Sequence, residues 1–242
     1  AHSIRCHTET EPLMDSIYHS LSQSLINCMV NCPIQMLRNL ALKILNQFIT
    51  TLEEHSRLEF LKLIITTCPY HTVTAFMIVR LKDEVERTWN ESAKTNNFKS
   101  PLLTHVVLDI VGRVASPNSE ILSRVEIMMS ILNFYRFLLI RDKNTNLTGI
   151  WTPSRLKEIK SSFLEPLKKE ITSILEHKPT DKEKEQTLQM AKQYGLPEMS
   201  PEDMKRAQDA NNTTLLLMQD TLLRVMELIQ GALPVSVANN NA

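Results

Sequence analysis

The sequence predicts an all-α protein, built as a HEAT/armadillo-like α-solenoid of about eight to nine helices. Apolar residues recur at every third or fourth position along nearly the whole chain, and no segment alternates with a period of two strongly enough to predict a strand. The chain also holds only 4 glycines in 242 residues, where average usage would give about 17. Because glycine supplies phosphate-binding loops and tight hairpins, this scarcity disfavours Rossmann enzymes, P-loop ATPases and β-rich barrels.

Four helices are expected in the first 90 residues. Leu13, Ile17, Leu21 and Leu25 fall on every fourth position and predict a first helix over about residues 12–30. Cys32-Pro33 ends it, because proline disrupts a helix interior. The later helices are expected over 33–52, around Leu58, Leu61 and Ile65 as far as Cys68-Pro69, and from Val73 to near Asn90.

A weak internal repeat supports the solenoid. Cys32-Pro33 and Cys68-Pro69 lie 36 residues apart, and each pair precedes an apolar helix. In the same register Leu37 matches Val73, and Leu40 matches Phe76. Repeats of this length, each a pair of helices, are typical of α-solenoids.

The middle of the chain is expected to hold the most buried helix. A polar loop over 91–99 ends at Ser100-Pro101, a start signal for a helix over 102–114. A long helix over 120–141 is apolar almost all round between residues 127 and 140, so we expect it to have neighbours on several sides and a central position. A loop over 142–151 follows it.

The last third has two expected helices. Thr152-Pro153 begins a helix that reaches about His177, and Pro166 is expected to kink or divide it. Residues 178–193 are polar and charged, and they form either a surface helix or a mobile linker. Ser200-Pro201 begins the last helix, which Gly231 is expected to stop, and residues 234–242 are expected to be disordered.

These elements suggest three parts. Residues 1–30 are expected to be the N-terminal helix of a solenoid that continues upstream, because the chain begins at Ala1 without methionine. Residues 31–230 are expected to form a C-terminal HEAT-like repeat domain, and residues 231–242 a disordered tail.

Composition excludes several classes of protein. The 27 Lys and Arg residues balance 27 Asp and Glu residues, so neither a nucleic acid nor a membrane surface is an expected partner. Cys6, Cys28, Cys32 and Cys68 are too few and too irregularly spaced for a disulfide framework, and we expect buried, reduced thiols. With no signal peptide and no apolar stretch of about 20 residues, we expect the protein in the cytoplasm or the nucleus. We also expect a monomer.

The sequence predicts no enzyme, cofactor or metal. The motifs G-x-S-x-G, G-x-x-x-x-G-K-[ST] and H-E-x-x-H are all absent from the chain. His2 and His7 flank Cys6, but a frayed terminus explains them better than a metal site does. An enzyme with a site between helices is the competing hypothesis from another class, and it would require a deep pocket with clustered, perturbed carboxylates or histidines.

Two residues are unusual for their surroundings. Arg136 interrupts the most apolar helix, where its charge either forms a salt bridge, reaches past the core edge, or is presented to a partner. Trp151 follows a polar loop directly, where it either packs the next helix or anchors an interface.

Several segments resemble the glomulin and aberrant root formation protein family. The longest is residues 130–142, SILNFYRFLLIRD, followed by LTGIW at 147–151. Shorter ones are Cys32-Pro33-Ile34 with Leu37-Arg38, FLEPL at 163–167, MSPE at 199–202 and LLRVMELI at 222–229. The similarity is discontinuous from about residue 31 to residue 229 and corresponds to the C-terminal part of the family's full length.

The resemblance implies an all-helical HEAT-like fold without catalysis. In this family the C-terminal region of glomulin binds the RING domain of the RING-box subunit of cullin-RING ubiquitin ligases, and it covers the docking surface of the ubiquitin-conjugating enzyme. The expected partner is therefore a RING-box protein and, through it, a cullin. The alternative is a helical scaffold that binds an unrelated partner.

Chemistry and position select the candidate contact residues, which lie in the C-terminal part of the long helix, in the loop after it and on the last helix. They are charged, amide, hydroxyl or aromatic side chains that a partner could bind: Arg136, Arg141, Asp142, Asn146, Thr148, Trp151, Arg206 and Arg224.

Overall fold

The computed structural model describes residues 11–90, 96–114, 121–177 and 200–231, and all regular structure in these ranges is helical. This confirms the predicted all-α, solenoid-like fold. The chain divides into two compact units, Ala1–Val106 and Val107–Ala242. The boundaries expected after residues 30 and 230 stay predictions.

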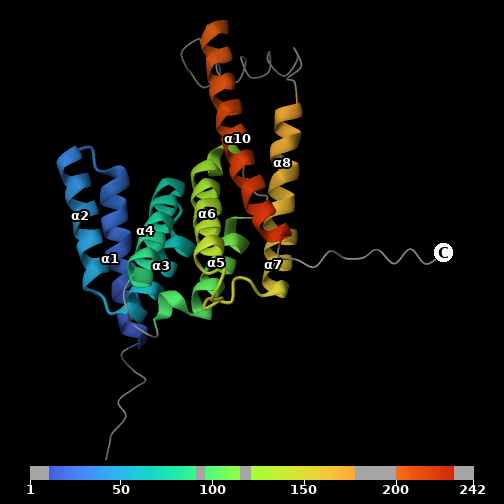
Figure 1. Cartoon of the computed structure of the whole chain (residues 1–242). Coiled ribbons are helices and arrows are strands. Elements are labelled where there is room, and N and C mark those ends of the chain that lie inside the picture. Colours follow the sequence, from blue (N-terminus) through green and yellow to red (C-terminus); the bar gives the residue numbers. More distant parts are fainter. Residues whose placement is uncertain (1–10, 91–95, 115–120, 178–199, 232–242) are drawn as a thin grey trace, which may run out of the picture. The chain divides into compact units, whose positions relative to one another are not determined.

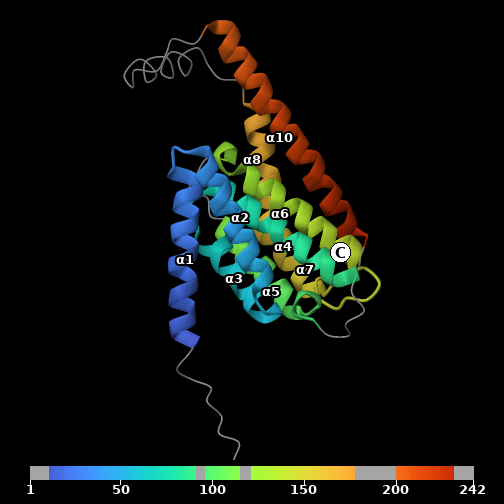
Figure 2. The same ribbon diagram turned by 90° about the vertical axis from the view of Figure 1, so that its left-hand side faces the viewer.

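Two helix pairs form the first unit (Figure 1). Helices α1 (Glu11–Asn31) and α2 (Gln35–Thr51) pack side by side, as do α3 (Glu54–Thr67) and α4 (His71–Asn90). Figure 2 shows that α1 and α2 run in opposite directions, as their short connection requires. Paired helices joined by short turns are the repeating unit of an α-solenoid.

The predicted repeat is present in the first unit. Each Cys-Pro pair stands immediately before a helix, since α2 begins at Gln35 and α4 at His71. One matched pair differs in burial, because Val73 is buried while Leu37 is exposed, whereas Leu40 and Phe76 are both exposed. The repeat is therefore seen in the positions of the helices along the chain, and equivalent side chains in its two copies are not all buried alike.

An aromatic cluster joins the first three helices. The rings of Tyr18, Phe48 and Phe60 come from α1, α2 and α3, and their centroids lie 5.2 to 5.8 Å apart in edge-to-face geometry. Such pairs each contribute about 1 kcal/mol beyond the area that they bury. This contact attaches α1 to the two helices that follow it.

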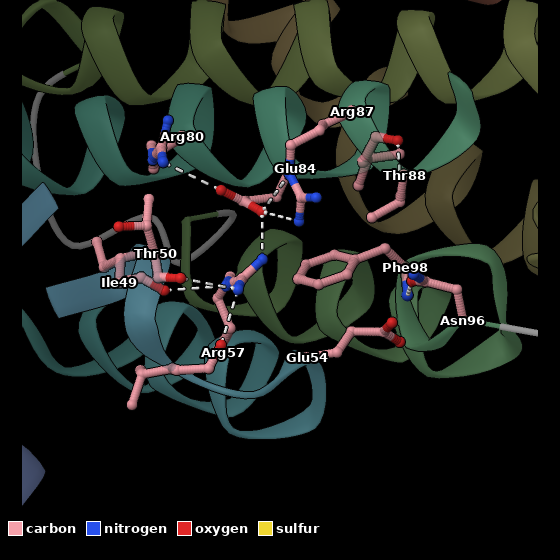
Figure 3. A network of polar contacts seen from close by, with 12 residues as sticks. Ile49, Thr50, Glu54, Arg57, Arg80, Glu84, Arg87, Thr88, Asn96 and Phe98 are labelled. Carbon is pink, nitrogen blue, oxygen red and sulfur yellow. Dashed lines mark hydrogen bonds and ion pairs between the residues drawn. The ribbon is translucent and has the colours of Figure 1, made fainter. Parts of the chain in front are cut away.

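A polar network lies between α2, α3 and α4, around the carboxylate of Glu84 (Figure 3). Glu84 is only 2% exposed and pairs with Arg57 at 2.9 Å, Arg80 at 3.0 Å and Arg87 at 2.9 Å. The guanidinium of Arg57 also donates to the carbonyl groups of Ile49, Thr50 and Leu52 at the end of α2. The network therefore supplies donors to the last turn of α2 and binds it to α3 and α4.

A 3₁₀ helix lies where the sequence predicts only a polar loop. This helix, η1 (Asn97–Lys99), is begun by Asn96, whose side chain accepts a hydrogen bond from the N–H of Phe98. Phe98 is fully buried, and η1 packs against α3 and α4. The buried Phe98 ring and a hydrogen bond from the Asn97 N–H to the Glu54 carboxylate both attach this polar segment to the unit. Helix α5 (Pro101–Val114) follows and contains the boundary between the two units.

Helices α6 (Ile121–Arg141) and α10 (Pro201–Gln230) pack together in the second unit. Helix α6 is buried over most of its circumference, as its apolar sequence predicts. Its buried Arg124 pairs at 3.1 Å with Glu170, which lies on a neighbouring helix, α8 (Glu165–Glu176).

The predicted division at Pro166 is also present. Helix α7 (Pro153–Ile159) passes through one π-helical turn, η2 (Lys160–Leu164), into α8, and Pro166 stands in the first turn of α8. Proline has no N–H to donate to the preceding turn, so the chain widens locally there.

Both predicted features of α10 are present at its ends. The hydroxyl of Ser200 accepts from the N–H of Asp203, and Gly231 closes the helix with right-handed φ and ψ angles. The expected linker over 178–193 and tail over 234–242 lie outside the described residues.

Removing the charge of Glu84 should destabilise the first unit. In Glu84→Gln, three guanidinium groups lose the carboxylate that they share, and we expect the free energy of unfolding to fall by about 3 kcal/mol. Urea unfolding followed by circular dichroism measures this. The control is Glu86→Gln on the same helix, which removes only an exposed partner of Lys82 and should cost less than about 0.5 kcal/mol. Equal losses in the two variants would contradict a structural role for the network.

Candidate functional site

The loop between α6 and α7 is built around the buried carboxylate of Asp142. One carboxylate oxygen accepts from the Thr145 hydroxyl at 2.7 Å and the Leu147 N–H at 2.8 Å. The other accepts from the N–H and the hydroxyl of Thr148, at 2.8 and 2.6 Å. Asp142 and Thr148 are both fully buried. A carboxylate with four donors fixes the backbone of a segment that has no regular structure.

The second half of this loop is held by Asn146 and Trp151. Asn146 has a φ of 46° and Gly149 a φ of 71°, so both occupy the left-handed region that asparagine and glycine tolerate best. The Asn146 side chain accepts from the N–H of Trp151 at 3.0 Å. The indole N–H of Trp151 donates to the carbonyl of Leu139 at 3.1 Å, which satisfies the last turn of α6. Trp151 is half-buried, so packing and hydrogen bonding account for most of its surface.

Two large apolar side chains are exposed around this fixed backbone. Ile140 is 52% exposed at the end of α6, and Leu147 is 47% exposed within the loop. The Leu147 N–H donates to Asp142, which lies two residues after Ile140. This hydrogen bond places the Leu147 backbone beside the end of α6. Arg141 and Lys143 are exposed next to them. We call the exposed residues Ile140, Arg141, Lys143, Asn146 and Leu147 the loop surface.

Helix α10 contributes a second exposed apolar stripe. Its inward face buries Leu215, Met218, Leu222, Val225 and Ile229. On the outward face Leu216, Leu217 and Leu223 are exposed, beside the ion pair of Arg224 with Asp220 at 2.8 Å. In both views the C-terminal end of α10 lies at the same end of the second unit as the loop after α6 (Figures 1 and 2).

Arg206 is separated from these residues. It lies near the start of α10, about 27 Å from Arg224 along the helix axis, and it is paired loosely with Asp203 at 3.7 Å. The structure therefore brings Arg224 to the end where the loop surface lies and leaves Arg206 at the other end of the helix.

Arg136 is half-buried on α6, and its Nε has no hydrogen-bond partner among the described residues. The same is true of the hydroxyl of its neighbour Tyr135, and burial raises the pKa of this phenol. The most deeply buried arginine of the helix is Arg124, which the sequence analysis did not single out. Its position on the helix face that carries Ile121 and Met128 was the available signal.

The candidate residues thus divide by role. Asp142 and Thr148 are buried and hold the loop together, whereas Arg141, Asn146 and Arg224 are exposed. The sequence analysis missed Ile140 and Leu147. Leu147 could have been found as the only large apolar residue between Lys143 and Gly149, but Ile140 is indistinguishable from the buried residues of the same apolar run.

Among the described residues, no group of three or more His, Cys, Asp and Glu side chains could hold a metal ion. His2, Cys6 and His7 lie outside the described residues. None of the described helices is long and apolar enough to span a bilayer.

Fold and surface together define a helical-repeat protein with a fixed, partly apolar loop. Residues 2–215 match a family described as "Uncharacterised protein family, YAP/Alf4/glomulin". The chain belongs to this family. It is 26% identical to human glomulin over 220 residues and 26% identical to mouse glomulin over 226 residues. Each alignment covers 87% of this chain and 37% of the relative, so the chain spans little more than a third of the length of these relatives.

Replacing the central carboxylate of the loop should loosen it. Asp142→Asn leaves one oxygen to accept and turns an NH₂ group toward two of the four donors, so we expect a loss of about 3 kcal/mol in the free energy of unfolding. Urea unfolding measures the loss, and tryptophan fluorescence reports the combined surroundings of Trp89 and Trp151. The control Asp220→Asn breaks only an exposed pair and should cost less than about 0.5 kcal/mol. A loss in Asp142→Asn no larger than in the control would refute the organising role of this carboxylate.

Proposed function

We propose that this chain is a non-catalytic regulator of cullin-RING ubiquitin ligases. It binds the RING domain of the RING-box subunit through the loop surface and masks the surface on which the ubiquitin-conjugating enzyme docks. Membership of the YAP/Alf4/glomulin family supports the choice of partner. Because the chain spans 37% of the length of its glomulin relatives, the activity is proposed for this part alone.

The exposure of Ile140 and Leu147 on a fixed backbone is the observation that carries the proposal. A RING domain receives its conjugating enzyme on a small apolar patch, so a competitor must offer apolar anchors inside a polar rim. Each of these side chains is about half exposed, and its burial by a partner would contribute about 1 kcal/mol. Because Asp142 already orders the loop, binding need not supply the entropy cost of ordering it.

The cations beside these anchors have a different role. Arg141 and Lys143 are exposed, and rim charges chiefly affect the rate of association and its dependence on salt. Regulation by masking needs only a shaped surface and no reactive group, which agrees with the absence of catalytic motifs from the sequence.

Replacing Leu147 by serine should weaken binding without unfolding the chain. Calorimetry with a purified RING-box protein–cullin complex should show about a fivefold loss of affinity for Leu147→Ser, since burial of this half-exposed side chain contributes about 1 kcal/mol. The loss should appear equally in the inhibition of ubiquitin discharge from a charged conjugating enzyme. Met36→Ser is the matched control, because it removes an apolar side chain that is 72% exposed in the first unit.

Two outcomes distinguish a wrong contact surface from a wrong partner. If the unaltered, folded chain binds the complex and Leu147→Ser binds equally well, the loop surface is not the contact. If the unaltered chain does not bind at micromolar concentration, the regulator proposal fails, and the chain is a helical scaffold for another partner.

The charge reversal Arg141→Glu tests the rim. We expect binding to weaken most at low salt, with an increase in the dissociation constant of about fivefold that shrinks as ionic strength rises. Thermal unfolding should show a loss of about 1 kcal/mol or less, because the side chain is exposed at a helix end. Unchanged affinity at every salt concentration would remove Arg141 from the interface.

A further inference from the structure

A second surface lies in the first unit, along the polar side of α2. An open groove of about 440 Å³ is lined by five polar residues of α2, by Leu42, and by Arg80 of α4. The five polar residues are Asn39, Lys43, Asn46, Gln47 and Thr50. They recur every three or four positions and so form one continuous face of the helix. The groove belongs entirely to the first unit, whereas the loop surface of the proposed function belongs to the second.

The groove is cationic. None of the residues that line it is acidic, and α2 contains no Asp or Glu at all. Lys43 forms no ion pair with any residue in the described ranges. Arg80 does have a partner, Glu84, but this single carboxylate is shared with two other arginines. Figure 3 shows Arg80 on the side of the network where Thr50 lies. Lys43 and Arg80 therefore leave positive charge at the groove.

The groove also presents hydrogen-bonding groups suited to a peptide backbone. Over the described part of the chain, the side chains of Asn46 and Gln47 have no intramolecular hydrogen bond. Each amide has both donors and an acceptor, which is what an extended backbone requires. A folded partner would cover its own backbone groups, whereas an extended segment offers them freely.

We propose that this groove binds an extended acidic peptide segment. Its carboxylates pair with Lys43 and Arg80, and its backbone bonds to the amides of Asn46 and Gln47. From Asn39 to Thr50 the groove follows α2 for about 16 Å, which roughly five residues of extended peptide cover. Leu40, exposed one turn before Lys43, provides an apolar contact at the edge of the groove.

Fluorescence anisotropy with a synthetic peptide tests this on the whole chain. The probe is a fluorescein-labelled peptide of alternating glutamate and serine, and its control has glutamine in place of every glutamate. We expect saturable binding of the glutamate peptide, at least about tenfold weaker binding of the glutamine peptide, and an affinity that falls as salt rises. Equal binding of the two peptides, or no binding of either, would overturn the proposal.

Matched variants locate the site. Lys43→Gln should weaken binding of the glutamate peptide about fivefold, which corresponds to about 1 kcal/mol for one exposed charge contact. Asn46→Ala should weaken the binding of both peptides. Lys169→Gln removes an exposed charge from α8 in the second unit and should change nothing. Arg80 is not varied, because its loss would also disturb Glu84. Equal losses in Lys43→Gln and Lys169→Gln would show that the peptide is held by charge alone and not by the groove.

Discussion

Helices that end without glycine leave backbone carbonyl groups that need donors from elsewhere in the chain. This chain has only 4 glycines, and long side chains supply many of those donors. Arg57 donates to three carbonyl groups at the end of α2, Arg38 donates to those of Cys32 and Pro33, and Trp151 donates to that of Leu139. Each of these side chains joins residues from two segments, so satisfying a helix end also fixes how the chain turns.

The same constraint explains how the loop between α6 and α7 is held together. Asp142 follows α6 directly and satisfies N–H groups of the loop with its carboxylate, while Trp151 returns to cover the last turn of α6. These hydrogen bonds fix the loop backbone, so Leu147 is held in solvent beside the exposed Ile140 at the end of α6. A loop held in this way presents apolar area to a partner at low entropic cost. Residues that hold the loop therefore alternate with candidate contact residues along this short segment.

Periodicity was sufficient to predict the helices, because the apolar stripe of each helix is a local property of its own sequence. The Cys-Pro turns, the division at Pro166 and the start of α10 at Ser200 were likewise local signals. Contacts between distant segments were not predictable. Nothing near Glu84 in sequence shows that Arg57, 27 positions earlier, binds its carboxylate. In the same way, the sequence around Asp142 is typical of a surface loop, and only the hydrogen bonds from Leu147 and Thr148 show that its carboxylate is enclosed. Candidate residues chosen for their chemistry therefore included two that are buried.

Net charge is a poor guide to the charge of a single surface for a related reason. The total of zero sums over helices whose local compositions differ widely: α2 carries Arg38 and Lys43 with no acidic residue, whereas α10 begins with Glu202 and Asp203. Screening limits each exposed charge to about 10 Å, so an approaching partner interacts with one face and not with the total. A balanced chain can therefore present a cationic groove in one unit and a mainly apolar contact surface in the other. The exclusion drawn from net charge applies to partners that need a long basic surface, and it does not extend to short acidic segments that cover one groove.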